Sequence, residues 1–201
     1  MKPKLLIASN NPGKHREMRA LLASLNIEVL SPQDAQAKLN VHETGTSYSE
    51  NARLKAMAYL AATGLPTLAD DSGLEVDILN GAPGIHSARF SAKENASDAN
   101  RRAHLLAQLR DKPQPWNAHF HCTAILALSE NESIETTGRC DGLIIPDERG
   151  TGGFGYDPVF YLPEFQATMA ELLPEIKNQI SHRAKAIRAM LPLIQSKLIA
   201  N

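Results

Sequence analysis

Short apolar runs alternate with amphipathic segments along this chain, a pattern that is typical of α/β proteins. Residues 5–8 form a continuous apolar run that ends in turn-forming residues, which predicts a buried strand. A helix is predicted directly after it, with Asn11 as N-cap and Pro12 at the first helical position. Its apolar positions keep steps of three and four: Met18, Leu21, Leu22 and Leu25.

Three further helices follow from capping and periodicity. Residues 47–50 fit a capping box, and Gly64 predicts the end of the helix that begins there. Residues 97–110 place leucines on one face and predict a third helix. The last helix is expected to begin at Ser181, which would cap it, and Pro192 inside its apolar pattern predicts a kink or an early end.

The remaining apolar segments predict strands. Residues 66–69 lead as a strand into Asp70-Asp71-Ser72-Gly73, and residues 74–79 are another extended or short helical piece. Residues 119–128 and 133–145 predict an antiparallel hairpin, which excludes a purely parallel sheet. We therefore expect an α/β fold with a mixed central β-sheet and flanking helices. The chain shows no repeat and no linker, so residues 1–201 are interpreted as a single domain.

Composition and charge narrow the possible partners. Lys plus Arg (21) nearly balances Asp plus Glu (22), which argues against a broad surface for nucleic acid. The apolar run at residues 5–8 is too short for a signal peptide or a membrane span. Cys122 and Cys140 have no metal-site spacing and do not suggest a disulfide-stapled scaffold. We expect a soluble, cytoplasmic protein that binds neither nucleic acid nor membrane.

The first loop is a candidate anion site. Asn and Gly residues at 9–14 let backbone amides turn towards a ligand, and the following helix amino terminus favours negative charge. Lys14 adds a full positive charge there, although the spacing is not that of a Walker A loop. An ordinary strand-to-helix turn would use the same residues, so this alternative stays open.

The adjacent carboxylates Asp70 and Asp71 are a sharper signal. Two such groups repel each other unless a cation compensates them, and neighbouring strand residues point to opposite faces. One of them could bind Mg²⁺ while the other orients water or a basic group, and Glu43 is a candidate partner carboxylate. The alternative is a solvated turn. The expected position at a strand's end favours function, because open α/β sheets bind ligands there.

Two later segments could recognise a base. In the glycine-flanked loop, Phe154 could stack on a base and Asp157 could accept a proton from its edge, whereas Tyr156 or Phe160 could instead fill the core. Residues 177–183 place the donors of His182 and Arg183 at the start of the last helix, where the alternative is a solvated basic turn. His119 and His121 share a strand face, but incidental histidines are the better interpretation.

Seven ordered motifs together resemble the inosine triphosphate pyrophosphatase family, in its bacterial XTP/dITP diphosphatase branch. They are SNNPGK (9–14), ETG (43–45), ENARLK (50–55), ADDSGL (69–74), GAPGIHSAR (81–89), GFGYDP (153–158) and KNQISHR (177–183). The resemblance implies two α/β lobes around a nucleotide-binding cleft, a homodimer, and Mg²⁺-dependent cleavage of non-standard purine nucleoside triphosphates to the monophosphate and pyrophosphate. His86 departs from the tyrosine that the family often has.

The resemblance also implies roles for single residues. Glu43 and Asp71 would be the Mg²⁺ ligands, with Asp71 also the proton acceptor and Asp70 in support. The triphosphate would contact Ser9, Asn10, Asn11, Pro12, Gly13, Lys14 and Lys55. The rest of the substrate would contact Ser72, Phe154, Gly155, Tyr156, Asp157, Lys177, His182 and Arg183.

Two rival functions remain. One is a pyrophosphatase of similar fold that acts on modified pyrimidine nucleotides. The other is a non-catalytic nucleotide sensor, which the acidic pair disfavours, because a pure binder gains little from negative charge beside phosphates.

Overall fold

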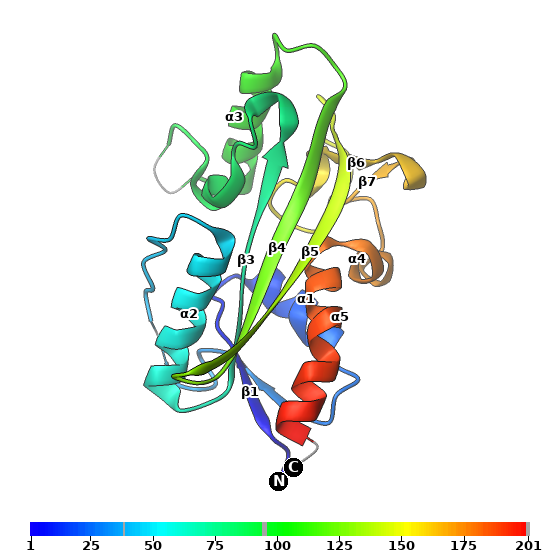
Figure 1. The fold of residues 1–201 in the computed structure, drawn as a ribbon. Coiled ribbons are helices and arrows are strands. Elements are labelled where there is room, and N and C mark those ends of the chain that lie inside the picture. Colours follow the sequence, from blue (N-terminus) through cyan, green and yellow to red (C-terminus); the bar gives the residue numbers. More distant parts are fainter. Residues whose placement is uncertain (38, 94–95, 200–201) are drawn as a thin grey trace. The chain divides into compact units, whose positions relative to one another are not determined.

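The computed structural model describes residues 1–37, 39–93 and 96–199 (Figure 1). It contains a seven-stranded sheet with the strand order β2-β1-β3-β4-β5-β6-β7. The strands are β1 (Lys4–Ile7), β2 (Glu28–Leu30), β3 (Thr67–Val76), β4 (Trp116–Ser129), β5 (Glu132–Ile144), β6 (Phe160–Leu162) and β7 (Ala167–Thr168). β1 pairs in parallel with β2 and β3, whereas β6 pairs antiparallel with β5 and β7. The predicted mixed α/β fold is confirmed.

The helices of the described residues include those that the sequence predicted and one that it did not. They are α1 (Pro12–Leu22), α2 (Tyr48–Thr63), α3 (Asp98–Leu109), α4 (Pro174–Ile180) and α5 (His182–Ile194). The Asn11 side chain accepts the first amides of α1, Ser47 caps α2 and Ser97 caps α3 in a capping box. Gly64 ends α2 with a left-handed φ of 66°, the conformation for which glycine is favoured.

The carboxyl-terminal segment differs in detail from the expectation. The short helix α4 was not predicted, and Ser181, with extended backbone, separates it from α5. α5 continues through Pro192 to Ile194, and a π-helical segment, Gln195–Ile199, follows. Pro192 is thus near the end of the regular helix. Within the described residues, no helix combines the length and the apolar character needed to cross a bilayer.

The chain divides into two compact units. Unit 1 comprises Met1–Asp71, Cys122–Gly138 and His182–Asn201, and unit 2 comprises Ser72–His121 and Arg139–Ser181. The borders fall inside β3, β4 and β5 and between α4 and α5, so no linker is needed to join the units. This explains why the sequence shows none.

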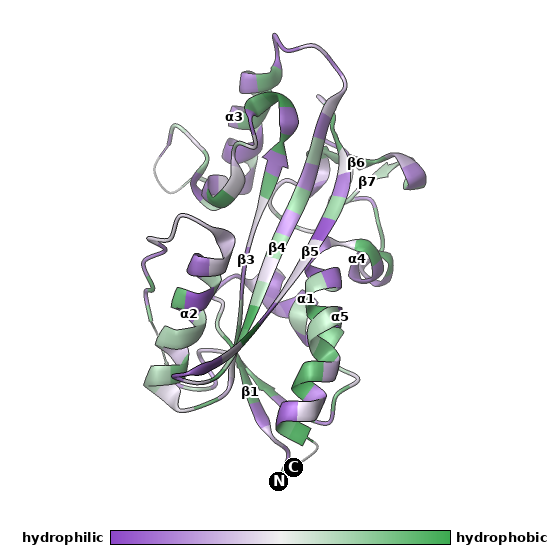
Figure 2. Ribbon diagram, viewed as in Figure 1, coloured by the Kyte–Doolittle hydropathy of each residue, from purple (hydrophilic) through white to green (hydrophobic). Residues whose placement is uncertain are grey.

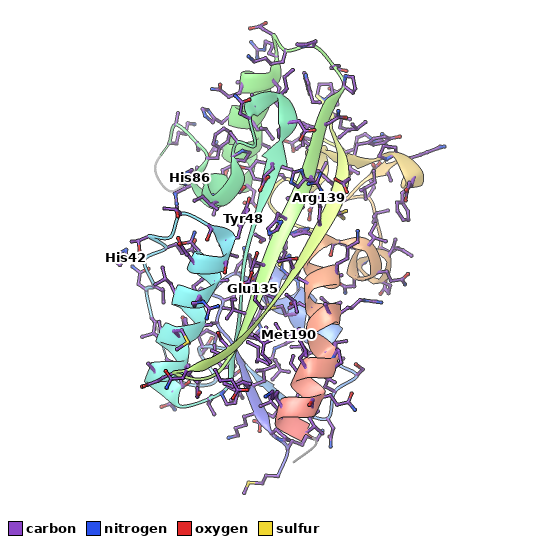
Figure 3. All side chains as sticks on the ribbon, in the orientation of Figure 1. His42, Tyr48, His86, Glu135, Arg139 and Met190 are labelled. Atoms are coloured by element: carbon purple, nitrogen blue, oxygen red, sulfur yellow. The ribbon has the colours of Figure 1, made fainter. Side chains whose placement is uncertain are left out.

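Strand alternation builds the two core layers of unit 1. In β1, Leu5 and Ile7 pack in one cluster with residues of α1 and α5, whereas Leu6 packs in the other with residues of α2. Figure 2 shows hydrophobic residues over much of α5, and the fully buried Met190, labelled in Figure 3, is one of them. Helices therefore cover both faces of this part of the sheet (Figure 1).

Unit 2 has its own core. Leu105 and Leu109 of α3 pack with Leu74 of β3 in one buried cluster. The rings of Phe120 and Phe160 lie 4.6 Å apart in the same cluster. Phe160 thus fills the core, which was one of the two interpretations of the aromatic residues near the glycine-flanked loop.

The acidic pair lies inside a strand, and the expectation that it follows a strand's end was wrong. β3 runs without interruption from Thr67 through Asp70 and Asp71 to Val76. Its parallel neighbour β1 ends at Ile7, which pairs with Leu68. β3 thus continues beyond the residues that pair with β1, and both carboxylates contact cationic side chains there.

Candidate active site

The carboxylate of Asp70 is buried and receives several donors on a single oxygen. Its Oδ2 atom lies 3.0 Å from Lys14 Nζ and 3.1 and 3.2 Å from Nη2 and Nε of Arg183. The Cys122 thiol contributes a weak contact at 3.8 Å. Burial alone would raise the pKa of Asp70, but the charges of Lys14 and Arg183 outweigh it and hold the pKa well below its usual range. Asp70 is therefore ionised at neutral pH.

Arg183 joins Asp70 to a second carboxylate. Its Nη1 atom lies 2.5 Å from Glu17 Oε2, and the whole residue is 1% exposed. Sequence reasoning missed Glu17, although Glu17 is three residues after Lys14 on α1 and so shares its helical face. Lys14, Glu17, Asp70 and Arg183 form one network of unit 1, in which Asp70 and Arg183 are buried and Lys14 and Glu17 are partly buried.

The carboxylate of Asp71 has different neighbours. Lys55 Nζ lies 3.0 Å from Asp71 Oδ1 and 2.9 Å from Glu43 Oε1, and Asn51 Nδ2 donates to Asp71 Oδ2 at 3.4 Å. Because these partners come from α2 and the loop before it, whereas those of Asp70 come from α1 and α5, the two side chains leave β3 on opposite faces. Burial raises the pKa of Asp71, an effect that the charges of Lys55 and Lys14 only partly offset.

The donor set around Lys55 fits a hard divalent cation. Glu43 and Asp71 both contact one ammonium group, so two carboxylate oxygens from different segments converge on a single positive charge. Asp70 Oδ1 is buried and has no hydrogen-bond partner among the described residues. Those residues contain no group of three or more His, Cys, Asp or Glu side chains placed to hold a metal. Mg²⁺ commonly uses only one or two carboxylates and completes its shell with water and substrate phosphates.

The first loop leads from β1 into α1. Ser9 Oγ accepts from the Asn11 amide at 3.2 Å, and Asn11 Oδ1 accepts from the amides of Gly13 and Lys14 at 2.8 and 3.2 Å. Asn10, Asn11 and Pro12 are exposed, whereas Gly13 is buried. The loop therefore brings Lys14 to Asp70 and leaves its tip accessible to a ligand.

The glycine-rich loop of unit 2 is organised around Asp157. Its Oδ2 atom accepts from the Phe154 amide at 2.9 Å and from Lys177 Nζ at 2.5 Å. The same ammonium lies 4.9 Å from the centre of the Phe154 ring, within cation–π range. The structure thus brings Phe154, Asp157 and Lys177 together.

Three other residues predicted to contact the substrate are Tyr156 and Ser72 of unit 2 and His182 of unit 1. Tyr156 is 4% exposed and its hydroxyl donates to the Ser87 carbonyl at 2.9 Å, and burial raises its pKa. His182, predicted to contact the base, is 5% exposed at the start of α5. Ser72, on β3, is half-buried. The substrate contacts predicted for these three residues stay predictions.

The histidines and cysteines that were not assigned to the site lie as follows. His119 Nε2 lies 3.1 Å from Glu75 Oε2 in unit 2, and Cys122 and Cys140 are both buried. His86, labelled in Figure 3, is exposed on the 3₁₀ helix Gly84–Arg89, where its Nδ1 accepts from Arg89 Nε at 3.2 Å.

Comparisons with known proteins agree with one another. A protein from Geobacillus kaustophilus named dITP/XTP pyrophosphatase is 50% identical over 91% of this chain and 90% of its own length. A HAM1 protein from Coxiella burnetii is 40% identical and superimposes with a TM-score of 0.87 over 96% of this chain and 99% of its own. A dITP/XTP pyrophosphatase from Mycobacterium abscessus is 43% identical, with a TM-score of 0.73 over 94% and 99%.

The model of the Ham1 family matches residues 5–193. This match spans every motif described above and nearly the whole chain. The chain belongs to the Ham1 family.

Proposed function

We infer that this protein hydrolyses non-standard purine nucleoside triphosphates, dITP, ITP and XTP, to the monophosphate and pyrophosphate. The names of relatives that are 43–50% identical over at least 91% of the chain support this activity. The observation that carries the chemistry is the contact of Lys55 with both Glu43 and Asp71. It places two carboxylates and a cation together, as phosphoryl transfer to water requires.

Glu43 and Asp71 would hold Mg²⁺, which on binding polarises the phosphoryl group and offsets the charge of the triphosphate. A triphosphate carries about four negative charges at neutral pH, so a chain of nearly balanced charge must meet it with local cations. Lys55 and Lys14 are those cations in unit 1. Asp71 orients a water molecule and accepts its proton, while the water oxygen bonds to the α-phosphorus and the bond to the β-phosphate breaks.

Asp70 has a different task in this proposal. Its ionised carboxylate fixes the ammonium group of Lys14 at 3.0 Å and is itself fixed by Arg183. Lys14 is thereby held at the end of the first loop, where it would meet the leaving pyrophosphate. Arg183 donates to Asp70 through Nε and Nη2 and to Glu17 through Nη1. The contact of Arg183 with the base stays a prediction.

In unit 2, Phe154, Asp157 and Lys177 would contact the nucleoside. A purine with a 6-oxo group presents a hydrogen-bond acceptor at C6 and a donor at N1. Lys177 can donate to the first and Asp157 can accept from the second. Adenine presents the reverse pattern and would leave buried groups unpaired. We further propose that the enzyme acts in the cytoplasm as a homodimer.

Turnover of dITP, ITP, XTP, GTP, ATP and a modified pyrimidine triphosphate, with pyrophosphate release as readout, tests this proposal. We expect release from the first three in the presence of Mg²⁺ and little with EDTA. Preferred turnover of the pyrimidine would support the rival pyrophosphatase. Binding of every nucleotide without release of pyrophosphate would support a sensor and refute the enzymatic proposal.

A further inference from the structure

Both backbone groups of Gly155 are bound by the first two turns of α3. The Gly155 amide donates to Asp98 Oδ2 at 2.8 Å, and the Gly155 carbonyl accepts from Arg102 Nη1 at 2.8 Å. Asp98 and Arg102 are four residues apart and therefore lie on the same side of the helix. Gly155 lies more than 50 residues away along the chain, so this contact is tertiary.

Hydrogen bonds restrain this peptide on a side where packing does not. Gly155 has a φ of +63°, in the left-handed region, and a Cβ built on it would meet nothing within 4 Å. Packing therefore does not hold the backbone on that side. Gly155 directly follows Phe154 and lies two residues before Asp157, so its dihedral angles set the relative placement of those side chains.

The two α3 side chains are themselves fixed. Arg102 Nη2 lies 2.8 Å from Glu148 Oε2, and the Arg102 side chain is 12% exposed. Asp98 forms a further ion pair with Arg101, and Ser97 and Asn100 begin the helix with a capping box. The charged side chains of Asp98 and Arg102, both on helix α3, thus hold the backbone of Gly155.

We propose that Asp98 and Arg102 are positioning residues for nucleoside recognition, acting by clamping Gly155 between Phe154 and Asp157. This inference rests on the proposed contact of Phe154 and Asp157 with the nucleoside. Neither α3 residue touches the substrate; each fixes the loop that does. Without the clamp the loop samples further conformations, and the nucleoside must select the competent one, which weakens its binding without altering the chemical step.

Steady-state kinetics with dITP can test this through two matched pairs of variants. Arg102→Ala removes the donor to the Gly155 carbonyl, whereas Arg102→Lys keeps a charge but cannot bind that carbonyl and Glu148 together. Asp98→Ala removes the acceptor, whereas Asp98→Asn retains an oxygen. Arg110→Ala, at the exposed C-cap of α3, is the control. Inorganic tripolyphosphate, which has no nucleoside, is the matched probe, and its inhibition of dITP turnover is measured for each variant.

We expect Arg102→Ala and Asp98→Ala to raise KM for dITP about tenfold each, with kcat within about threefold of wild type. Asp98→Asn should recover most of the affinity, Arg102→Lys should be intermediate, and Arg110→Ala should be unchanged. The inhibition constant of tripolyphosphate should stay the same in all. If Arg102→Ala does not fold, Arg102→Lys and the Asp98 pair still decide the question.

Two outcomes would overturn the inference. An unchanged KM in the Ala variants, or a loss of kcat alone, would assign the clamp a purely structural role. An equal weakening of dITP and tripolyphosphate would mean that the effect is not specific to the nucleoside. Phe154→Ala separates this failure from that of the proposed function: if it raises KM while the clamp variants do not, only the clamp fails.

Discussion

Gly153 and Gly155 provide a matched pair of substitutions within one loop. Both have left-handed φ angles, +71° and +63°, so an alanine at either position costs about 1–2 kcal/mol in backbone energy. A Cβ at Gly155 meets nothing, but a Cβ at Gly153 would lie 2.0 Å from Asp157 Oδ2 and 3.1 Å from Asp157 Cβ. Rotation of the carboxylate alone cannot relieve this contact, because the Asp157 Cβ is also crowded.

The clash would act on the ion pair between Asp157 and Lys177. Both residues are buried, at 3% and 6% exposure, and their charged atoms lie 2.5 Å apart. Separating a buried pair costs about 3–5 kcal/mol, because each charge is left without its partner. We therefore expect Gly153→Ala to lose roughly 4 kcal/mol or more of unfolding free energy, against about 1–2 kcal/mol for Gly155→Ala.

Urea unfolding of the two variants and the wild type measures this difference. The dITP KM of each folded variant should follow the same order, because the displaced carboxylate belongs to the proposed nucleoside contact. Equal losses of stability, within about 0.5 kcal/mol, would refute the assignment of Asp157 and Lys177 as a tightly fixed buried pair.

Three further substitutions test unit 1. Gly138→Ala would place a Cβ 2.1 Å from the His182 carbonyl oxygen and should cost about 2–3 kcal/mol in urea unfolding; a stability equal to that of the wild type would contradict the close approach of α5 to β5. Arg183→Ala removes a cation that contacts both Asp70 and Glu17 and leaves Lys14 as the partner of Asp70, so it should cost about 3–5 kcal/mol; a loss under about 1 kcal/mol would contradict the proposed network. Because the folded pKa of Asp70 is lowered, its stabilisation is present above the unfolded pKa of about 3.9 and is lost as pH falls below it. In Asp70→Asn, the unfolding free energy should therefore fall less steeply than in the wild type as the pH is lowered. An unchanged slope would exclude a stabilising role of the ionised Asp70 carboxylate.

The helix boundaries were predictable because capping is local. Asn11 followed by Pro12, and Ser47 with Gly64, specify their helix ends through contacts within a few residues. The continuation of β3 through Asp70 and Asp71 was not predictable in this way. Whether two adjacent acids end a strand depends on cations such as Arg183, which is 113 residues away along the chain.

Several residues of the candidate site were predictable from the sequence, but their tertiary partners were not. The carboxylates at 43 and 71 indicated a cation site, the family resemblance added Lys55 as a phosphate contact, and the structure brings the three side chains together. The burial of Arg183 between Asp70 and Glu17 could not be predicted from the sequence. It depends on tertiary contacts of the first turn of α5, which the local sequence does not determine. Asp98 and Arg102 showed only helix-surface character, since their partner is a distant backbone peptide.

The central claim is that Asp71 supports hydrolysis with Mg²⁺, and its asparagine variant tests this most directly. Turnover of dITP by wild-type protein and by folded Asp71→Asn would be measured over a range of Mg²⁺ concentrations. Our account predicts a Mg²⁺-dependent wild-type rate and a loss of at least about a hundredfold in the variant that additional Mg²⁺ does not restore. Turnover by Asp71→Asn close to that of the wild type would contradict it.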